Sequence, residues 1–312
     1  MPEAGQFNAD SLDISAALAA LERDGIIVIR GLWSDDQLRT AQTAFRARLG
    51  QMTWNNLSGY ERSELFRLMV EDVLQLEQSF VDLAVHPMVM DLARRYIGDG
   101  AQLCEAKGWR SLATTREFHG WHADAWYDQD RVTDRIPREL KLATYLTDVQ
   151  SGGFNYLPGS HRKQPPNAVR HNDYARLTET DFINLLAPAG TTFVFDTSGV
   201  HRQGHPMLQD REAIFYCMHD ASEPIQREDL AYYRYHPLLL NAAFLGGLEP
   251  EQTRFLGFGD QRHFVLGHRR TDPHPRFSTA ARWLWRGVLE AHGQTSLIAS
   301  KWQGLLRRLR RT

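Results

Sequence analysis

Short runs of aromatic and β-branched residues, separated by Gly, Pro and Asn, recur between Leu103 and His219. Such runs with turn residues between them are typical of β-sandwiches and barrels. No glycine-rich phosphate loop follows any of the runs, which disfavours a dinucleotide-binding fold. The sequence therefore predicts a mainly β protein, with strands expected at 103–107, 110–118, 140–148, 153–158, 191–196 and 211–219.

Helical patterns flank this stretch on both sides. Capping signatures precede the first two predicted helices, and His86-Pro87 interrupts the third, because residues before proline prefer extended backbone. Asp24-Gly25 predicts a turn ahead of a buried strand at 26–29. We expect residues 1–10 to form a loose tail, and 240–270 show no clear pattern. Helices are predicted over 16–23, 35–49, most of 62–97, 276–292 and 295–311.

Composition places the chain among ordinary globular proteins. Of its 312 residues, 42% are hydrophobic and 24% charged, and a net charge of -2 gives no general attraction to nucleic acid. Cys104 and Cys217 lie far apart without metal-site spacing, which favours a reducing, cytoplasmic location. We expect no signal peptide and no spanning helix. We predict one domain over 1–312, with a helical N-terminal part to about 100, a β core over 101–220 and a partly helical extension over 221–312.

Two segments carry residues suited to a metal site, His122-Ala-Asp124 and, much later, His201. A His-x-Asp pair with a distant His is the sequence form of a facial triad, which holds Fe(II) on one face and leaves other positions open. Side chains alternate along a strand, so His122 and Asp124 would project to the same side. Since most His-x-Asp pairs are surface groups with local hydrogen bonds, the prediction depends on the surrounding segments.

His205 is an alternative to His201 as the third ligand. Arg211 opens the next predicted strand, ten residues after His201. A buried guanidinium there can bind a carboxylate through two parallel hydrogen bonds, whereas an exposed one would form only a weak surface ion pair.

The region between the ligand segments has two further features. A strand from Gly152 ends in Pro158-Gly-Ser-His161, a turn in which proline fixes φ and glycine permits positive φ. We interpret His161 as a turn residue with local contacts. Residues 125–137 are polar and aromatic without a clear period, and predict a long loop that could cover the site as a lid.

Taken in order, these segments resemble the phytanoyl-CoA dioxygenase-like family of Fe(II)/2-oxoglutarate-dependent oxygenases. The resemblance covers about residues 16–220. Ser151 stands where the family more often has Asn, a difference that touches only a turn. Four segments carry the resemblance: Asp24–Gly31, His122-Ala-Asp124, Gly152–His161, and Phe195-Asp196 with His201 and Arg211.

The resemblance implies a double-stranded β-helix, the jelly-roll core of cupin-like proteins, with helices against one sheet. It implies that His122, Asp124 and His201 bind Fe(II). The family's interval between the last histidine ligand and the arginine favours His201 over His205, because Arg211 follows His201 by ten residues. Arg211 would bind the distal carboxylate of 2-oxoglutarate. Thr144 is our candidate for a hydroxyl that assists this carboxylate, with an ordinary strand threonine as the alternative.

The implied activity is a dioxygenase that uses Fe(II), 2-oxoglutarate and O2 to hydroxylate a C–H bond of a small molecule, with release of succinate and CO2. Asp124 favours hydroxylation or a related oxidation, because related halogenases have a small residue at that place. Two alternatives are a metal-dependent enzyme without redox chemistry, such as a zinc hydrolase, and a non-catalytic binding protein. A carboxylate clamp at Arg211 would distinguish the oxygenase from the hydrolase.

Substrate contacts are less constrained. Aromatic walls suit most small ligands, so they identify none. Basic residues on the predicted strands could receive an anionic group or be solvated. A basic C-terminal segment, Lys301–Arg311, predicts a helix that either lies on an anionic membrane surface or packs against the protein. The aromatic candidates are Trp109, Trp121, Trp126 and Tyr127, and the basic ones are Lys107, Arg110 and Arg116.

Overall fold

The computed structural model describes residues 2–51, 67–117, 119–225, 238–258 and 284. Its strands are β1 (Gly5–Asn8), β2 (Ile26–Arg30), β3 (Arg67–Val70), β4 (Ala101–Ser111), β5 (Glu139–Tyr145), β6 (Val149–Tyr156), β7 (Ile183–Ala187), β8 (Thr192–Asp196), β9 (His201–Gln203) and β10 (Arg211–Asp220). Its α-helices are α1 (Ile14–Asp24), α2 (Asp35–Gln51), α3 (Gln78–Ala84), α4 (Pro87–Ile97) and α6 (Pro250–Phe255). Short 3-10 helices lie at Ala9–Ser11, Val73–Gln75, Ser160–Arg162, Pro166–Ala168, His171–Tyr174 and Ala242–Phe244.

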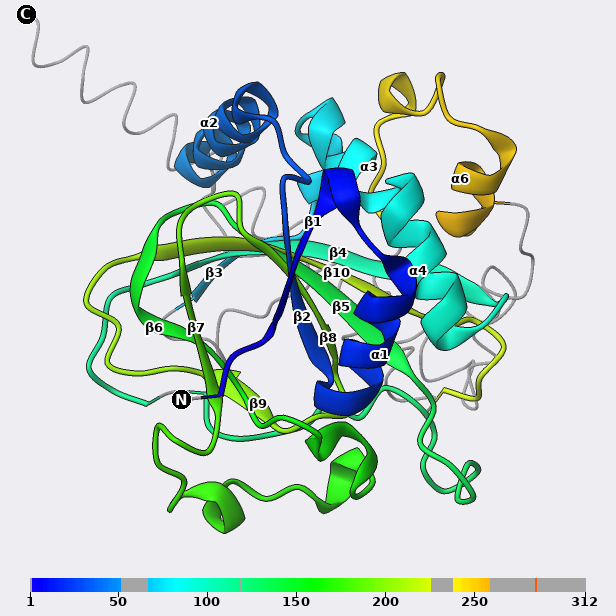
Figure 1. Ribbon diagram of the computed structural model, residues 1–312. Coiled ribbons are helices and arrows are strands. Elements are labelled where there is room, and N and C mark those ends of the chain that lie inside the picture. Colours follow the sequence, from blue (N-terminus) through cyan, green and yellow to red (C-terminus); the bar gives the residue numbers. More distant parts are fainter. Residues whose placement is uncertain (1, 52–66, 118, 226–237, 259–283, 285–312) are drawn as a thin grey trace, which may run out of the picture. The chain divides into compact units, whose positions relative to one another are not determined.

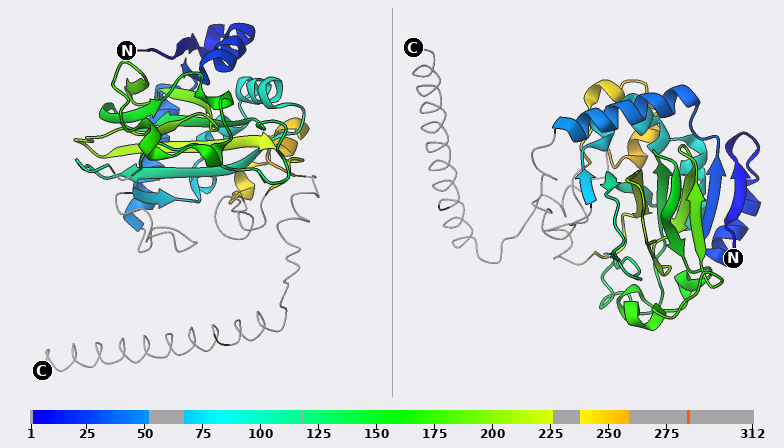
Figure 2. Two further views of the ribbon diagram at one scale, coloured as in Figure 1. Left: turned by 90° about the horizontal axis from the view of Figure 1, so that it is seen from below. Right: turned by 90° about the vertical axis from the view of Figure 1, so that its left-hand side faces the viewer.

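Two β-sheets pack against each other, and helices cover the outer face of the larger one (Figures 1 and 2). The larger sheet has the order β1-β2-β8-β5-β10-β4-β3, and the smaller has the order β7-β6-β9. The β1–β2 pair is parallel, whereas the other described strand pairs are antiparallel. The predicted mainly β jelly roll with flanking helices is confirmed.

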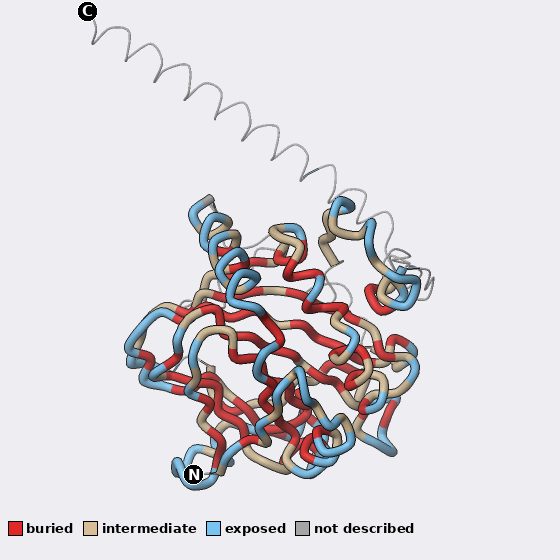
Figure 3. Tube along the Cα trace, turned by 45° about the horizontal axis from the view of Figure 1, so that its top comes forward, coloured by how far each residue is buried: buried red, intermediate tan, exposed pale blue. Residues whose placement is uncertain are grey.

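Alternate side chains of the larger sheet enter two different cores. On β2, Ile26 and Val28 pack between the sheets, whereas Ile27 and Ile29 pack under the helices. Buried residues therefore run continuously along the strands (Figure 3). Each such side chain contributes roughly 1.5–3 kcal/mol by leaving water. Burial on both faces explains why β2 is apolar at almost every position.

Local signals place the N-terminal helices as expected. The Asp13 carboxylate caps α1 by accepting hydrogen bonds from the backbone N–H groups of Ser15 and Ala16. Gly25 ends α1 in the left-handed region with φ of 80°. Ser34 and Gln37 exchange side-chain-to-backbone hydrogen bonds at the start of α2. The predicted break at His86-Pro87 separates α3 from α4.

The prediction was wrong at the N-terminus and within 62–97. Residues 5–8 are not a loose tail: they form β1 and pair in parallel with β2. Residues 67–70 are not helical, because they form β3 at the edge of the larger sheet. Neither segment shows a clear alternation of apolar residues, since each lies at a sheet edge.

The β-rich stretch also differs in detail. The two strands expected at 103–107 and 110–118 are one strand, β4, which ends at Ser111. Gly108 does not interrupt it, and its missing side chain leaves room for the Phe45 ring. Beyond Ser111, the β structure at 112–117 is an isolated bridge at Thr114. Strands β7 and β9 were not predicted.

The chain divides into two compact units, residues 1–267 and 268–312. Of the second unit only Leu284 is described. The helices predicted over 276–292 and 295–311 otherwise lie outside the described residues, as does the basic segment 301–311. A single domain over 1–312 stays a prediction. No described helix has the length and apolar character needed to cross a bilayer.

Gly25 offers a test of the packing between α1 and the sheets. A Cβ at this position would collide with the Tyr156 hydroxyl and lie 2.6 Å from the His161 ring. We expect Gly25→Ala to destabilise the protein by at least about 2 kcal/mol, because steric overlap adds to the strain of positive φ.

Gly50→Ala is the matched control, since a Cβ there meets nothing within 4 Å on helix α2. It should change the free energy of unfolding by less than about 1 kcal/mol, in the stabilising direction. Urea unfolding of both variants checks this, and equal effects would contradict the packing described.

Candidate metal centre

The loop between β4 and β5 carries His122 and Asp124, and backbone hydrogen bonds hold it against the segment that enters β9. The backbone N–H of His122 donates to the His201 carbonyl at 3.0 Å, and the N–H of His201 donates back at 2.8 Å. The Asp124 N–H donates to the Thr197 carbonyl at 2.9 Å. His122 and Asp124 thus lie on a loop with one isolated bridge, and not on a regular strand as the alternation argument assumed.

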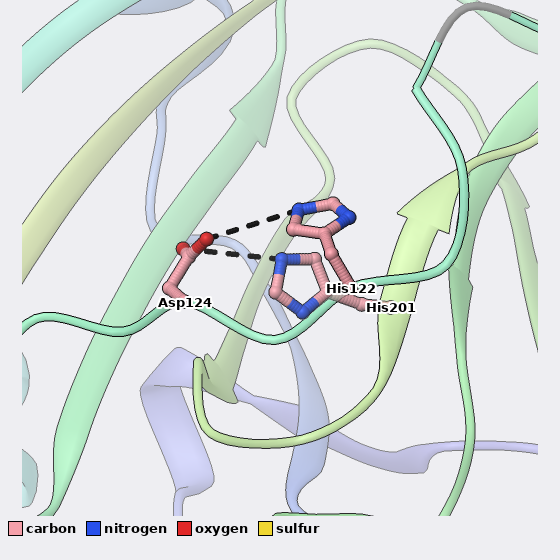
Figure 4. A group of neighbouring side chains, drawn as sticks. All are labelled: His122, Asp124 and His201. Carbon is pink, nitrogen blue, oxygen red and sulfur yellow. Dashed lines mark ion pairs between the residues drawn. The ribbon is translucent and has the colours of Figure 1, made fainter. Parts of the chain in front are cut away.

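This pairing brings the three predicted ligand residues together (Figure 4). Asp124 Oδ1 lies 3.8 Å from His122 Nε2, and Asp124 Oδ2 lies 3.9 Å from His201 Nε2. The candidate ligand atoms all lie within 4.8 Å of one another. Bonds from nitrogen or carboxylate oxygen to a divalent metal are about 2.0–2.2 Å long, so each of these two pairs can share one ion.

His205 does not join this group. Its Nδ1 lies 3.8 Å from Glu117 Oε1, and the group of converging ligand atoms consists of His122, Asp124 and His201. The structure therefore favours His201 over His205 as the third member of the cluster.

The two imidazoles are oriented in the same way. Each ring places Nδ1 beside a backbone carbonyl, that of Gly120 at 2.7 Å for His122 and that of Gly199 at 2.8 Å for His201. An Nδ1–H that donates to this carbonyl leaves the Nε2 lone pair for a metal. Burial lowers the pKa of His122, and it lowers the pKa of His201 to about 3. Both rings are therefore neutral at pH 7, and two imidazoles with one carboxylate suit Fe(II).

Lys141 on β5 is bonded to the carboxylate of the cluster, which the sequence reasoning missed. Its ammonium donates to Asp124 Oδ2 at 2.7 Å. Burial is the largest single influence and would lower the pKa of Lys141, but attraction to Asp124 and to the other acidic groups nearby together raises it. The lysine thus holds one carboxylate oxygen. Lys141 is the single charged residue in the otherwise mostly apolar run 140–146, and this isolated charge was the signal that the sequence offered.

A cavity of about 230 Å³ surrounds the cluster and is lined by residues of both sheets. The register of the larger sheet arranges its polar wall in rows across neighbouring strands. One end of the wall has Arg67, Ser111 and Arg211 side by side. Further along the strands come Lys107 beside Phe215, then Glu105 beside Cys217 and Lys141, and finally Glu139 beside His219.

Arg211 is buried at one end of this cavity. Its Nη1 donates to the Gly152 carbonyl at 2.8 Å, and its Nη2 donates to Gln203 Oε1 at 2.8 Å. Among the described residues, its Nε has no hydrogen-bond partner and no carboxylate forms an ion pair with Arg211. A buried cation held by neutral groups alone is costly, so this end of the cavity suits an anionic ligand.

Thr144 does not fit its predicted role. Its hydroxyl accepts a hydrogen bond from Trp33 Nε1 at 3.3 Å and lies 2.7 Å from Thr192 Oγ1. Both partners belong to the helix-covered side of the larger sheet, whereas the neighbouring Tyr145 packs between the sheets. Strand alternation therefore directs Thr144 away from the cavity, and the assignment is corrected.

The other predicted contacts divide between the cavity and the rest of the protein. Trp109, Trp126 and Lys107 line the cavity. Arg110 faces the opposite side of β4 and pairs with Glu212. The remaining candidates lie away from the cavity: Trp121 and Tyr127 are buried in separate clusters, Arg116 is exposed and His161 is buried at the turn after β6. Trp126 belongs to the predicted lid loop 125–137, and movement of that loop stays a prediction.

Several cavity residues were missed because their positions depend on tertiary pairing. His119 Nε2 lies 3.1 Å from His122 Nε2. At the other end, His219 Nδ1 lies 3.0 Å from Glu139 Oε2, and its ring stacks on Trp126 at 4.3 Å. Burial alone would lower the pKa of His219, but interactions with Cys104 and Glu139 raise it to about 10. Alternation along the predicted 211–219 strand could have placed His219 on the face of Arg211.

Asp196 anchors the segment that leads to His201. Its carboxylate accepts hydrogen bonds from the Tyr96 hydroxyl and the Ser198 N–H, both at 2.9 Å. Burial nevertheless raises the pKa of Asp196 to about 7.

This pKa predicts a pH-dependent stability. The pKa of Asp196 in the folded protein exceeds its value of about 3.9 in the unfolded chain, so protonation of Asp196 stabilises the fold. This stabilisation is complete below pH ~4 and is lost as the pH rises towards 7. Relative to Asp196→Asn, which cannot titrate, the wild type should lose up to about 1.4 kcal/mol per pH unit across this window. Urea unfolding at several pH values tests this, and parallel stability curves would contradict it.

Metal titration tests the histidine assignment. We expect Mn(II), as a redox-stable substitute, to bind the wild type and to bind His201→Ala at least about 100-fold more weakly, because one of three ligands is removed. His205→Ala should bind as the wild type does. Calorimetry gives both affinities, and equal losses in the two variants would count against the cluster.

Comparisons with known proteins address the family. The family model described as phytanoyl-CoA dioxygenase (PhyH) matches residues 21–205. No curated protein matches the chain.

Solved structures show a similar fold. The non-heme alpha ketoglutarate dependent epimerase SnoN from nogalamycin biosynthesis has a TM-score of 0.52 at 18% identity, covering 67% of this chain and 83% of SnoN. SnoN in complex with Fe3+, alpha ketoglutarate and nogalamycin RO has a TM-score of 0.51 at 17% identity, covering 68% and 86%. AviO1 from Streptomyces viridochromogenes Tue57 has a TM-score of 0.49 at 20% identity, covering 69% and 98%.

The family match covers more than half of the chain and contains both ligand segments, and the fold agrees with it. The chain therefore belongs to the phytanoyl-CoA dioxygenase family, whose cofactors are Fe(II) and 2-oxoglutarate.

Proposed function

We propose that this protein is an Fe(II)/2-oxoglutarate-dependent dioxygenase that hydroxylates a C–H bond of a small-molecule substrate. One observation carries the proposal. Three ligand atoms of His122, Asp124 and His201 converge in a cavity that also contains the buried guanidinium of Arg211. This combination joins a metal site of low charge to a site for an anion.

The described residues fit the metal. His122 Nε2, His201 Nε2 and one oxygen of Asp124 would hold Fe(II), and Lys141 would keep the other oxygen of Asp124 in place. When bound, Fe(II) and 2-oxoglutarate supply the activation of O2, with 2-oxoglutarate converted to succinate and CO2 as the substrate C–H becomes C–OH.

Arg211 would bind the distal carboxylate of 2-oxoglutarate. A carboxylate would give the buried guanidinium the charged partner that the described residues do not provide. The hydrogen bonds to Gly152 and Gln203 restrict the guanidinium before the co-substrate arrives, which lowers the entropic cost of binding.

Hydroxylation is the outcome we propose among the reactions open to this site. Asp124 supplies a carboxylate where related halogenases have a small residue. SnoN shows that the same fold also serves an epimerase. A zinc hydrolase does not require the anion site at Arg211 and therefore fits less well, and a non-catalytic protein would require neither the cluster nor the anion site.

The cavity wall supports a polar small molecule as substrate. Glu105, Lys107, Glu139 and Lys141 all line the cavity. These groups are paired with one another or with Asp124 and His219. An apolar chain in contact with them would remove their remaining water without offering hydrogen bonds. Cys104 and Cys217 form no disulfide, which agrees with a cytoplasmic location, and we propose no nucleic-acid partner.

Anaerobic spectroscopy tests the proposal. Adding Fe(II) and 2-oxoglutarate to the full-length protein should produce a weak visible charge-transfer band, because the keto acid binds the metal directly. His122→Ala should lose the band, whereas His205→Ala should retain it. On admission of O2, the wild type and His205→Ala should form succinate slowly, whereas His122→Ala should not.

Failure of the folded wild type to give the band would reject the proposal. Survival of an undiminished band in His122→Ala would reject the ligand assignment while leaving the family unchanged.

A further inference from the structure

A β-bulge in β4 inserts one extra residue, Cys104, into the wall of the cavity. On β10, Cys217 pairs with Glu105, and the residue after Cys217 pairs with Leu103. The register thus skips Cys104. A bulge can direct two consecutive side chains to one face of a sheet, where regular alternation would separate them. Cys104 and Glu105 accordingly both line the cavity.

The bulge places the Cys104 thiol beside an imidazole on the neighbouring strand. His219 on β10 pairs with Gln102 of β4 on one side and with Glu139 of β5 on the other. Its Nδ1 lies 3.0 Å from Glu139 Oε2, and the same ring interacts with the Cys104 side chain. Cys104, His219 and Glu139 all line the cavity. A thiol, an imidazole and a carboxylate therefore follow one another across three adjacent strands.

The imidazole of this row is protonated at neutral pH. Burial would lower the pKa of His219, but its interactions with Cys104 and Glu139 raise it to about 10. The Glu139 carboxylate is itself held in place, since its Oε1 accepts a hydrogen bond from the Thr197 hydroxyl at 2.7 Å. A nucleophile beside an imidazole that a third group orients is the arrangement by which proteins activate a side chain. A neighbouring imidazolium favours the thiolate of a cysteine, which is its reactive form.

Cys217 provides an internal comparison, because it lines the same cavity. Cys104 is 7% exposed and Cys217 is 6% exposed, so the two thiols are equally buried. They are the two cysteines of the chain. Burial raises the pKa of the Cys217 thiol, and the charged groups that act on this thiol are Glu139, Lys141, Glu105 and Lys107. Cys104 thus differs from Cys217 in its imidazolium neighbour and not in its burial.

We infer that Cys104, His219 and Glu139 form a reactive-thiol site, at which a small carbon electrophile that enters the cavity becomes attached covalently to Cys104. The sulfur forms the new S–C bond as the leaving group departs with its bonding electrons. The thiol proton, which Cys104 can share with the Gln102 carbonyl 3.3 Å from its Sγ, passes to solvent. His219 keeps both of its protons, and the step needs no oxidant or reductant.

The position of Cys104 determines what such a modification would block. Cys104 lies between the rows of Cys217 and His219, towards the end of β10, whereas Arg211 begins that strand. An adduct would therefore fill the end of the cavity remote from Arg211. The site requires neither the metal nor 2-oxoglutarate, so its failure would leave the proposed function standing.

Alkylation of the full-length protein by iodoacetamide tests the inference, with mass spectrometry of the two cysteine peptides as the measurement. At pH 7 we expect Cys104 to react at least about 10-fold faster than Cys217, because the thiolate is the attacking form. His219→Gln removes the cation and leaves a polar group, and it should lower the Cys104 rate by about 10-fold or more. The Cys217 rate should stay within about threefold, because its own surroundings are unchanged.

The pH dependence distinguishes an activated thiol from one that is merely accessible. A thiol whose pKa lies above the working pH loses about tenfold in rate for each pH unit, as its thiolate fraction falls. Cys217 should show this slope between about pH 8 and 6. The Cys104 rate should fall less steeply in the wild type and should take the full slope in His219→Gln.

His205→Gln is the matched control, since His205 is not among the residues that line the cavity and its ring lies near Glu117. Its Cys104 rate should equal that of the wild type. Equal rates of Cys104 and Cys217 in the wild type, or an unchanged Cys104 rate in His219→Gln, would overturn the inference. Faster labelling of both cysteines in His219→Gln would also overturn it, by showing that His219 only keeps the cavity closed. Should this variant not fold, the two pH slopes of the wild type decide alone.

Discussion

The backbone bridge between His122 and His201 is the interaction on which the site depends. It joins the loop after β4 to the segment entering β9, so that imidazoles from distant parts of the chain lie 4.3 Å apart between ring centroids. Each Nδ1 is then held by a carbonyl two residues earlier in its own segment. The bridge therefore brings the two imidazoles together, while these local carbonyls select the nitrogen available to a metal. Loss of the bridge would separate the ligands even if every side chain were kept.

A cavity with ionised walls can exist inside this fold because the strands have two differently packed faces. The helix-covered face of the larger sheet carries the larger apolar cluster and so contributes strongly to the hydrophobic stabilisation. The inner face can then carry charged residues whose partners of opposite charge lie on the same strand, on a neighbouring strand or at the metal cluster. Arg211 is different, because its described partners are neutral, and this difference directs attention to an anionic ligand at that end of the cavity.

Local sequence signals predicted the parts of the fold that local physics controls. Asp13 and Gly25 delimit α1, and the continuous apolar run of β2 reflects burial on both faces. Edge strands β1 and β3 were missed because partners distant in sequence stabilise them, and neither has a strong pattern of its own. The assignment to Thr144 failed for a related reason. Composition identified a hydroxyl on a strand, but only the register determined which face of the sheet it would occupy.

The sequence by itself determined the mainly β class, the order of the motifs, and the three residue types that could share a metal, because these depend on residue chemistry and short-range spacing. Tertiary structure alone decided which groups surround them. Lys141 on Asp124, and Cys104 beside His219, come from contacts across long separations in the chain. Register is a property of two strands together, so no single segment could have revealed the bulge at Cys104 or the charged wall opposite the metal cluster.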